Sequence, residues 1–175
     1  EMEHFTARKS RHNRNLDRAF DSIKSDRGLG AQTGKIMTQY WLMKSEPEEY
    51  GWHDLVRDGE GTWDGVRNAQ ASNNLKAMRE GDLALFYHSR TGLEVVGIMR
   101  VSAAAFPDPK DESGRWVAVK VQPVEPLRRA VTLKAIKANP KLANMAILRQ
   151  SRLSVAGVTC DEWGEIMRLA GNASF

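Results

Sequence analysis

The chain has 175 residues, enough for one domain with a single hydrophobic core and an additional segment. Its composition, 41% hydrophobic and 27% charged, is typical of a globular protein and excludes a disordered or fibrous chain. The formal net charge of +4 permits nucleic-acid binding, but residues 1–36 alone hold eight Lys or Arg against five Asp or Glu, so the remainder is almost neutral and phosphate affinity must come from local patches.

No apolar run reaches the roughly 18 residues that a membrane-spanning helix needs, and no apolar stretch near the N-terminus is typical of a secretory signal. The single cysteine, Cys160, excludes a disulfide within these residues and a thiolate cluster for zinc. We therefore expect a cytoplasmic protein without a membrane partner or a metal. We also expect a monomer without a cofactor.

Residues 1–36 have few apolar side chains and combine an Arg- and Lys-rich cluster with a glycine-rich stretch, which predicts a flexible basic extension. Leu16, Phe20 and Ile23 have the i, i+4, i+7 spacing of a short helix within it. The pattern changes at Met37, so we expect residues 37–175 to form the folded domain and native translation to start there.

From Tyr40 onward, short strands and short helices alternate. Apolar alternation and turn residues predict strands at residues 40–44, 82–87, 93–101, 116–121 and 153–158. Apolar periodicity and capping residues predict helices at residues 52–56, 68–78, 133–137, 140–148 and 161–169. Because these elements do not form regular strand-helix-strand units, we expect an α+β fold: a mixed, mostly antiparallel barrel of about five or six strands with helices around the rim.

Polar and aromatic side chains gather at the ends of several apolar segments. The stretches are Tyr40–Pro47 (YWLMKSEP), Thr62–Asn68 (TWDGVRN), Phe86–Ser89 (FYHS) and Arg149–Ser154 (RQSRLS). Since the loops of a rigid barrel share its mouth, we expect these groups to converge there.

In this order, with Val96-Gly97 between them and the closing Asp161-Glu162-Trp163, the stretches resemble the EVE domain family of the PUA-like superfamily. The most specific element is the run from Trp63 to Asn68, followed by Gln70, Asn73 and Asn74. The resemblance covers residues 40 to about 170 and implies a PUA-like barrel related to YTH and ASCH domains. It also implies recognition of a modified base, in DNA often a cytosine altered at ring carbon five, without catalysis.

The residue types suit that task. Aromatic stacking is worth about 1–3 kcal/mol per base but does not distinguish bases, so polar groups must identify the base edge. Trp63 is our candidate platform, and Lys44, Arg67 and Arg152 are candidates for phosphates or base edges. The full candidate set is Lys44, Ser45, Glu46, Trp63, Gly65, Val66, Arg67, Asn68, Tyr87, His88, Ser89, Gln150, Arg152 and Ser154.

Structural roles compete with these assignments. Asn68 is also a suitable helix N-cap, and His88 also suits a turn cap. Arg67 could pair with Asp64, and Arg152 with an acid across the sheet. Departures from the family pattern leave the preferred base open: Ala69 replaces a frequent aromatic residue, Ser72 replaces a frequent basic residue, and an acidic, proline-rich insertion is shortened to residues 106–114.

Other functions remain as alternatives. A PUA-like module could take a base from RNA instead of DNA. An enzyme acting on modified nucleotides or RNA could use His88 with Ser89, or His53 with Asp54, but the sequence has no nucleophile elbow, metal-ligand spacing or phosphate-cradling loop. A protein adaptor would need an exposed apolar face that the sequence does not indicate.

Overall fold

A computed structural model of the chain describes residues 39–173. The expected basic extension, with its short helix near residues 16–23, lies outside the described residues. None of the helices in residues 39–173 is long and apolar enough to cross a membrane.

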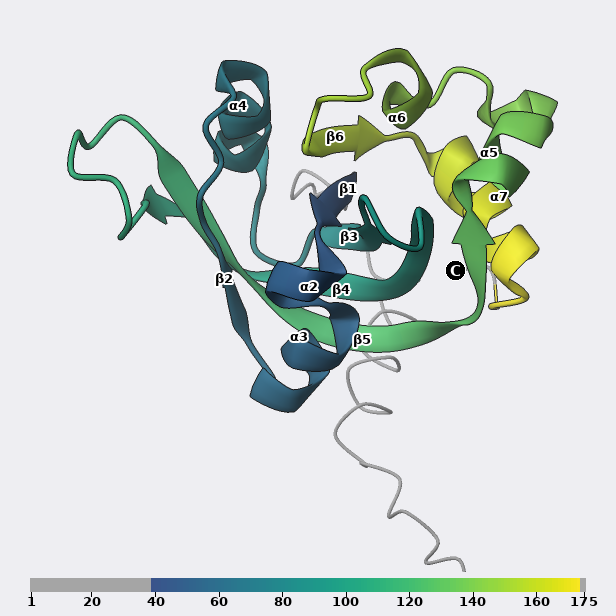
Figure 1. The fold of residues 1–175 in the computed structure, drawn as a ribbon, viewed down its shortest axis with the longest axis horizontal. Helices are drawn as coiled ribbons and strands as arrows, with labels where there is room; N and C mark the ends of the chain where they lie inside the picture. Colours follow the sequence, from purple (N-terminus) through teal and green to yellow (C-terminus); the bar gives the residue numbers. More distant parts are fainter. Residues whose placement is uncertain (1–38, 174–175) are drawn as a thin grey trace, which may run out of the picture. The chain divides into compact units, whose positions relative to one another are not determined.

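A six-stranded sheet with the order β2-β5-β4-β3-β1-β6 forms the centre of the described domain (Figure 1). Its strands are β1 (Tyr40–Ser45), β2 (Gly61–Trp63), β3 (Leu83–His88), β4 (Glu94–Pro107), β5 (Val117–Thr132) and β6 (Val155–Val158). β1 and β3 are parallel, and all other neighbouring strands are antiparallel. The mixed, mostly antiparallel α+β architecture is therefore as expected.

Short helices surround the sheet. They are α2 (Pro47–Tyr50), α3 (Trp52–Asp58), α4 (Ala69–Ala77), α5 (Leu133–Ala138), the 3-10 helix η1 (Pro140–Leu142), α6 (Ala146–Arg149) and α7 (Cys160–Ala170). α5 and α7 lie at one end of the sheet, and the loop joining β4 to β5 lies at the opposite end (Figure 1). α4 contacts β6 at one edge of the sheet order and also β4 and β5, so it connects strands that are not neighbours in the sheet.

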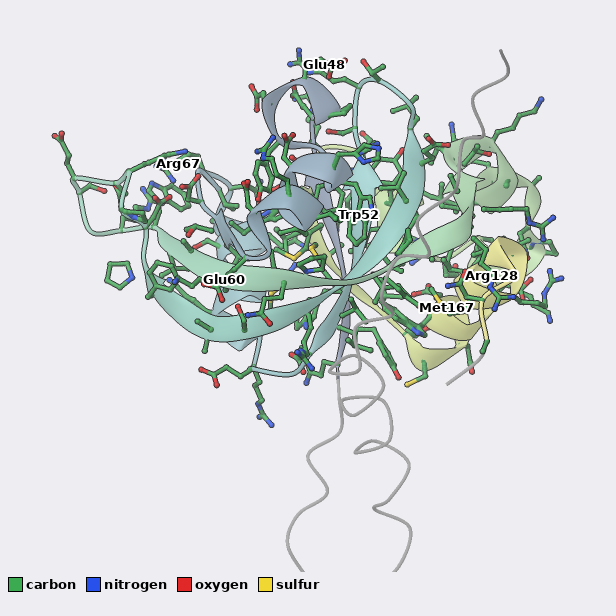
Figure 2. All side chains as sticks on the ribbon, turned by 90° about the horizontal axis from the view of Figure 1, so that it is seen from below. Glu48, Trp52, Glu60, Arg67, Arg128 and Met167 are labelled. Atoms are coloured by element: carbon green, nitrogen blue, oxygen red, sulfur yellow. The ribbon has the colours of Figure 1, made fainter. Side chains whose placement is uncertain are left out.

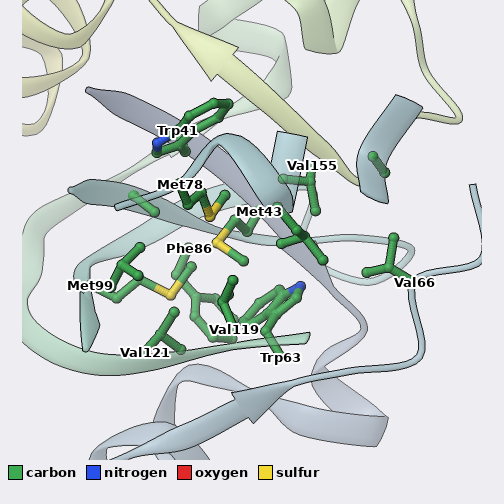
Figure 3. Close-up of a cluster of buried hydrophobic side chains, with 14 of the residues drawn as sticks. Trp41, Met43, Trp63, Val66, Met78, Phe86, Met99, Val119, Val121 and Val155 are labelled. Atoms are coloured by element: carbon green, nitrogen blue, oxygen red, sulfur yellow. The ribbon is translucent and has the colours of Figure 1, made fainter. Parts of the chain in front are cut away.

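The strands separate two apolar clusters. In β1, Trp41 and Met43 belong to one cluster and Leu42 to the other, because successive side chains of a strand point to opposite faces. The first cluster also takes Trp63 from β2 and Val155 from β6, the two edge strands (Figure 3). Since both edges contribute to the same core, the sheet curls around it into a barrel.

α3 is fixed across the middle of the sheet by its first residue. Trp52 lies against Gly97 of β4, where an added Cβ would come within 2.5 Å of the indole ring. The backbone N–H of Trp52 donates to Nε2 of His88, at the end of β3, over 3.2 Å. The Val96-Gly97 pair of the sequence pattern is therefore explained by close packing of a helix on the sheet.

Three expected elements differ from the structure. The strand expected at residues 93–101 is β4, which continues to Pro107. The strand expected at residues 116–121 starts at Val117 and continues to Thr132 through two prolines. The helix expected at residues 140–148 is divided into η1 and α6. α2 and β2 were not expected from the sequence.

Candidate functional site

A cavity of about 1060 Å³ opens where β1, β2 and β3 end. The four polar and aromatic stretches meet in its wall, and twelve of the fourteen candidate residues line it: Lys44, Ser45, Glu46, Trp63, Gly65, Val66, Arg67, Asn68, Tyr87, Ser89, Arg152 and Ser154. Ligand pockets typically measure about 300–1,000 Å³, so this cavity has room for a ligand the size of a nucleotide.

His88 and Gln150 are not among the lining residues. His88 accepts the hydrogen bond from Trp52 through Nε2, and burial lowers the pKa of its imidazole, so both effects favour the neutral ring. Gln150 accepts a hydrogen bond from Nε2 of Gln70 over 3.0 Å. Both side chains therefore have structural partners next to the cavity.

The apolar wall of the cavity is rigid. Trp63 is only 8% exposed, and its ring packs edge-to-face on Phe86 with a centroid distance of 5.4 Å (Figure 3). Tyr87 is 2% exposed, and burial, helped by the negative charge of Glu94, raises the pKa of its phenol. Both aromatic residues belong to a hydrophobic cluster and to the cavity wall at once, so the core fixes their orientation.

A buried carboxylate holds the loop between β2 and α4 in shape. Oδ2 of Asp108 accepts from the backbone N–H of Gly65 over 2.9 Å and from Nη1 of Arg67 over 2.6 Å. Oδ1 accepts from the backbone N–H of Lys110 over 2.7 Å. Burial raises the pKa of Asp108, but these hydrogen bonds outweigh it, and the pKa lies below its usual value.

Gly65 is needed for this geometry. Its φ of +73° is in the left-handed region, which costs glycine little and other residues more. No heavy atom beyond its chain neighbours would lie within 4 Å of an added Cβ, so the requirement is conformational and not steric. A close approach of the backbone to a ligand stays a prediction.

The ion pairs differ from those considered from the sequence. Arg67 pairs with Asp108 instead of Asp64, and lies 6.0 Å from the centroid of Trp116. Asp64 pairs with Lys110 over 2.9 Å. Figure 2 shows Arg67 beside the loop that joins β4 to β5. The loop between β4 and β5 thus provides Asp108 and Lys110, the ion-pair partners of Arg67 and Asp64.

The cavity has a local excess of positive charge. Five Lys or Arg and three Asp or Glu line it. Within residues 39–173, neither Lys44 nor Arg152 takes part in an ion pair, whereas Arg67, Arg90 and Lys110 each do. Nζ of Lys44 donates to the carbonyl of Ser151 over 2.8 Å, and burial lowers the pKa of this ammonium group. Two cations are therefore available to an anionic ligand.

Some polar groups of the wall already have protein partners. Oγ of Ser45 donates to the carbonyl of Tyr50 over 2.7 Å, and Oδ1 of Asn68 accepts from the backbone N–H of Ala71 over 3.0 Å as the N-cap of α4. The capping bond leaves Nδ2 of Asn68 as a donor for a ligand. Asn68 is therefore the N-cap of α4, as the sequence suggested, and its role as a base reader stays a prediction.

Sequence reasoning did not select ten further lining residues: Glu49, Tyr50, Thr62, Asp64, Arg90, Leu93, Lys110, Leu133, Ile147 and Ser151. Thr62, Asp64 and Ser151 lie inside the stretches that carried the resemblance. The remaining ones reach the cavity from outside those stretches. Among the described residues, no group of three or more His, Cys, Asp or Glu is placed to hold a metal ion.

Comparison with known proteins gives a consistent result. The family model of the EVE domain matches residues 39–169. Thymocyte nuclear protein 1 of Mus musculus is 34% identical, and the match covers 78% of this chain and 75% of that protein. The crystal structure of a protein from Agrobacterium tumefaciens is 43% identical with a TM-score of 0.77, covering 79% of this chain and 97% of the other. Human THYN1 protein, solved in complex with 5-methylcytosine containing DNA, is 31% identical with a TM-score of 0.70, covering 78% of this chain and 99% of the other.

A more distant likeness concerns the fold alone. The YTH domain of the Zygosaccharomyces rouxii MRB1 protein is 19% identical, with a TM-score of 0.51, and the match covers 80% of this chain and 88% of the other. Together with the curled mixed sheet, this likeness gives the described domain a PUA-like fold.

Proposed function

The chain belongs to the EVE domain family, and on that premise we propose that it is a non-catalytic nucleic-acid-binding module whose cavity holds one modified base, a cytosine altered at ring carbon five in DNA. The observation that carries the proposal is that the family's most specific run, from Trp63 to Asn68, meets the ends of β1 and β3 at one cavity. The DNA complex of the related human THYN1 protein supports the choice of ligand.

The cavity has an apolar wall that can contact the base and a polar rim that can form hydrogen bonds with it. Trp63 and Tyr87 offer aromatic surface that the core holds fixed, so little side-chain entropy is lost when a base contacts them. Nδ2 of Asn68 and the hydroxyls of Ser89 and Ser154 provide hydrogen-bonding groups for the polar edge of the base. Recognition then needs no charge transfer, no nucleophile and no metal.

Lys44 and Arg152 complete the proposed site as phosphate contacts. Neither is neutralised by a carboxylate within residues 39–173, and both line the cavity. The partial burial that lowers the pKa of Lys44 weakens its hydration, so a phosphate oxygen replaces lost water contacts. These contacts add affinity without base specificity.

The direct test is equilibrium binding of the full chain to fluorescent oligonucleotides of one sequence, with cytosine, 5-methylcytosine or 5-hydroxymethylcytosine at a single position. We expect the modified DNA to bind at least about tenfold more tightly than the unmodified DNA, equivalent to 1.4 kcal/mol. Matched RNA oligonucleotides form a second arm, and mass spectrometry of recovered oligonucleotides a third. Equal affinity for all DNA strands would contradict the proposal, tighter binding of the RNA would favour the RNA alternative, and a change in mass would indicate an enzyme.

Arg152→Ala is expected to weaken binding to modified and unmodified DNA by similar factors. It should also reduce the slope of log K against log salt concentration by about 1, because one phosphate contact is lost. Arg149→Ala is the matched control, since Arg149 is exposed on α6, does not line the cavity and carries the same charge. Titrations at four salt concentrations measure the slope for each variant. If Arg152→Ala and Arg149→Ala change the affinity and the slope equally, only the net charge of the protein matters.

A further inference from the structure

The hairpin between β3 and β4, residues 89–93, carries an exposed leucine at the rim of the cavity. Leu93 is 41% exposed and, with Val56, is one of two large hydrophobic side chains that the described residues leave exposed. Its φ of +49° is in the left-handed region, which bulky residues rarely adopt. A left-handed backbone at a bulky residue costs stability, and such residues cluster at ligand-binding segments, so the position calls for a functional explanation.

The hairpin is held firmly in place. The carbonyl of Leu93 accepts from the backbone N–H of Leu133 over 2.8 Å, which ties it to the first residue of α5. The backbone N–H of Ser89 donates to the carbonyl of Ser45 over 2.8 Å. Arg90 pairs with Glu46 over 2.8 Å. Leu93 therefore projects from a tip that is braced against both β1 and α5.

Leu93 stands between two hollows of different character. It lines the main cavity together with Leu133, and the same two leucines line a second hollow of about 430 Å³. Lys134 and Lys137 also line the second hollow. Three positions apart on α5, they share a face, and neither has a salt bridge within residues 39–173. Two leucines thus lie between the main cavity and a basic surface.

We propose that Leu93 enters the base stack of duplex DNA when the modified base leaves it for the cavity, while Lys134 and Lys137 contact phosphates of the neighbouring nucleotides. The ligand of the site is therefore a duplex and not a single strand. An extruded base leaves a gap in the stack, and an inserted apolar side chain fills it. The inference rests on the proposed function, because a base must enter the cavity for the gap to form.

The test compares Leu93→Ala with the parent chain on one 5-methylcytosine oligonucleotide, used as a single strand, as a matched duplex and as a duplex with a mismatch at the modified position. We expect the matched-duplex affinity to fall on the order of tenfold, because the unstacking cost is no longer offset. The single-strand affinity should change less than about twofold, since an unstacked base needs no wedge. The loss of affinity for the mismatched duplex should lie between these two losses, because the mismatched base is already partly released from the stack.

Two further variants separate the wedge from general effects. Val56→Ala removes the other exposed hydrophobic side chain, which is 50% exposed on α3 and lines neither hollow, and should leave all three affinities unchanged. Leu93→Met keeps an apolar side chain of similar reach and should retain most duplex affinity. Equal losses on single strand and duplex, or an unchanged duplex affinity, would overturn the wedge. If the parent chain prefers the modified base in a single strand but not in a duplex, the wedge proposal is wrong and the proposed function remains. If the parent chain shows no preference for the modified base in either form, both proposals are wrong.

Discussion

Replacing Trp63 with alanine is expected to lower the free energy of unfolding by about 3–5 kcal/mol, the usual cost of deleting a buried aromatic ring. Trp63 is 8% exposed, lies in the barrel core and packs edge-to-face on Phe86 (Figure 3). Selective binding should be lost as well, but the loss alone would not show that the ring contacts a base. Urea denaturation monitored by circular dichroism measures the stability change.

Trp63→Phe separates the two roles, because it keeps an aromatic ring and a folded chain. We expect the affinity of this variant for modified DNA to fall even under conditions in which the variant remains fully folded. Trp52→Phe is the matched control: Trp52 packs on the same Phe86, with a centroid distance of 5.7 Å, but does not line the cavity. If Trp63→Phe binds modified DNA as tightly as the parent, or if both variants lose affinity equally, the ring is not part of the binding wall.

Elements with strong local signals could be predicted from the sequence. β1 alternates between two apolar faces, α4 begins at the N-cap Asn68, and α7 begins with the Thr159–Glu162 capping box. Each signal lies within a few residues of the element that it marks. These elements were therefore expected within a few residues of where they lie.

β5 shows what local patterns miss. The strand was expected to end at Val121, yet Pro123 and Pro126 both lie inside it, opposite Met99 and Gly97 of β4. β2 pairs with β5 only between residues 119 and 121, so beyond Val121 no strand of residues 39–173 pairs with this edge of β5. A proline lacks the backbone N–H and is tolerated at such a free edge, especially where register shifts interrupt the ladder. β2 itself has three residues, too few for a sequence pattern.

Which residues meet at the cavity could be predicted from the sequence only where the ends of strands could be recognised. Two of the four stretches converge because β1 and β3 are parallel neighbours and end at the same side of the sheet. Arg149–Ser154 joins them because β6 is antiparallel to β1 and begins at that side. The partners of those residues could not be predicted: Asp108 meets Arg67 across 41 positions of sequence, and Asp64, closer in sequence, pairs elsewhere. Likewise, only the packing of Trp52 on Gly97 shows why His88 faces a backbone N–H.

Asp108→Ala is expected to cost about 3 kcal/mol of folding stability, since removal of one partner of a buried charged hydrogen-bond network leaves the others unpaired. The Asp108 side chain is fully buried, and its loss leaves the N–H groups of Gly65 and Lys110 without their acceptor. Arg67 is partly exposed and can turn to water, which limits the cost. Equilibrium denaturation measures the change.

The same substitution should also weaken binding of modified DNA by more than tenfold, because the loop from Asp64 to Asn68 is no longer held in its binding shape. Glu112→Ala, in the same β4–β5 loop, is the matched control: it also removes a carboxylate, but Glu112 is exposed and does not line the cavity. Hydrogen exchange of the Gly65 amide adds a direct readout, since its protection depends on the bond to Asp108. If the Gly65 amide exchanges fast but the affinity for modified DNA is unchanged, binding does not require a preformed loop. The residues that contact the base would then be those of β1 and β3.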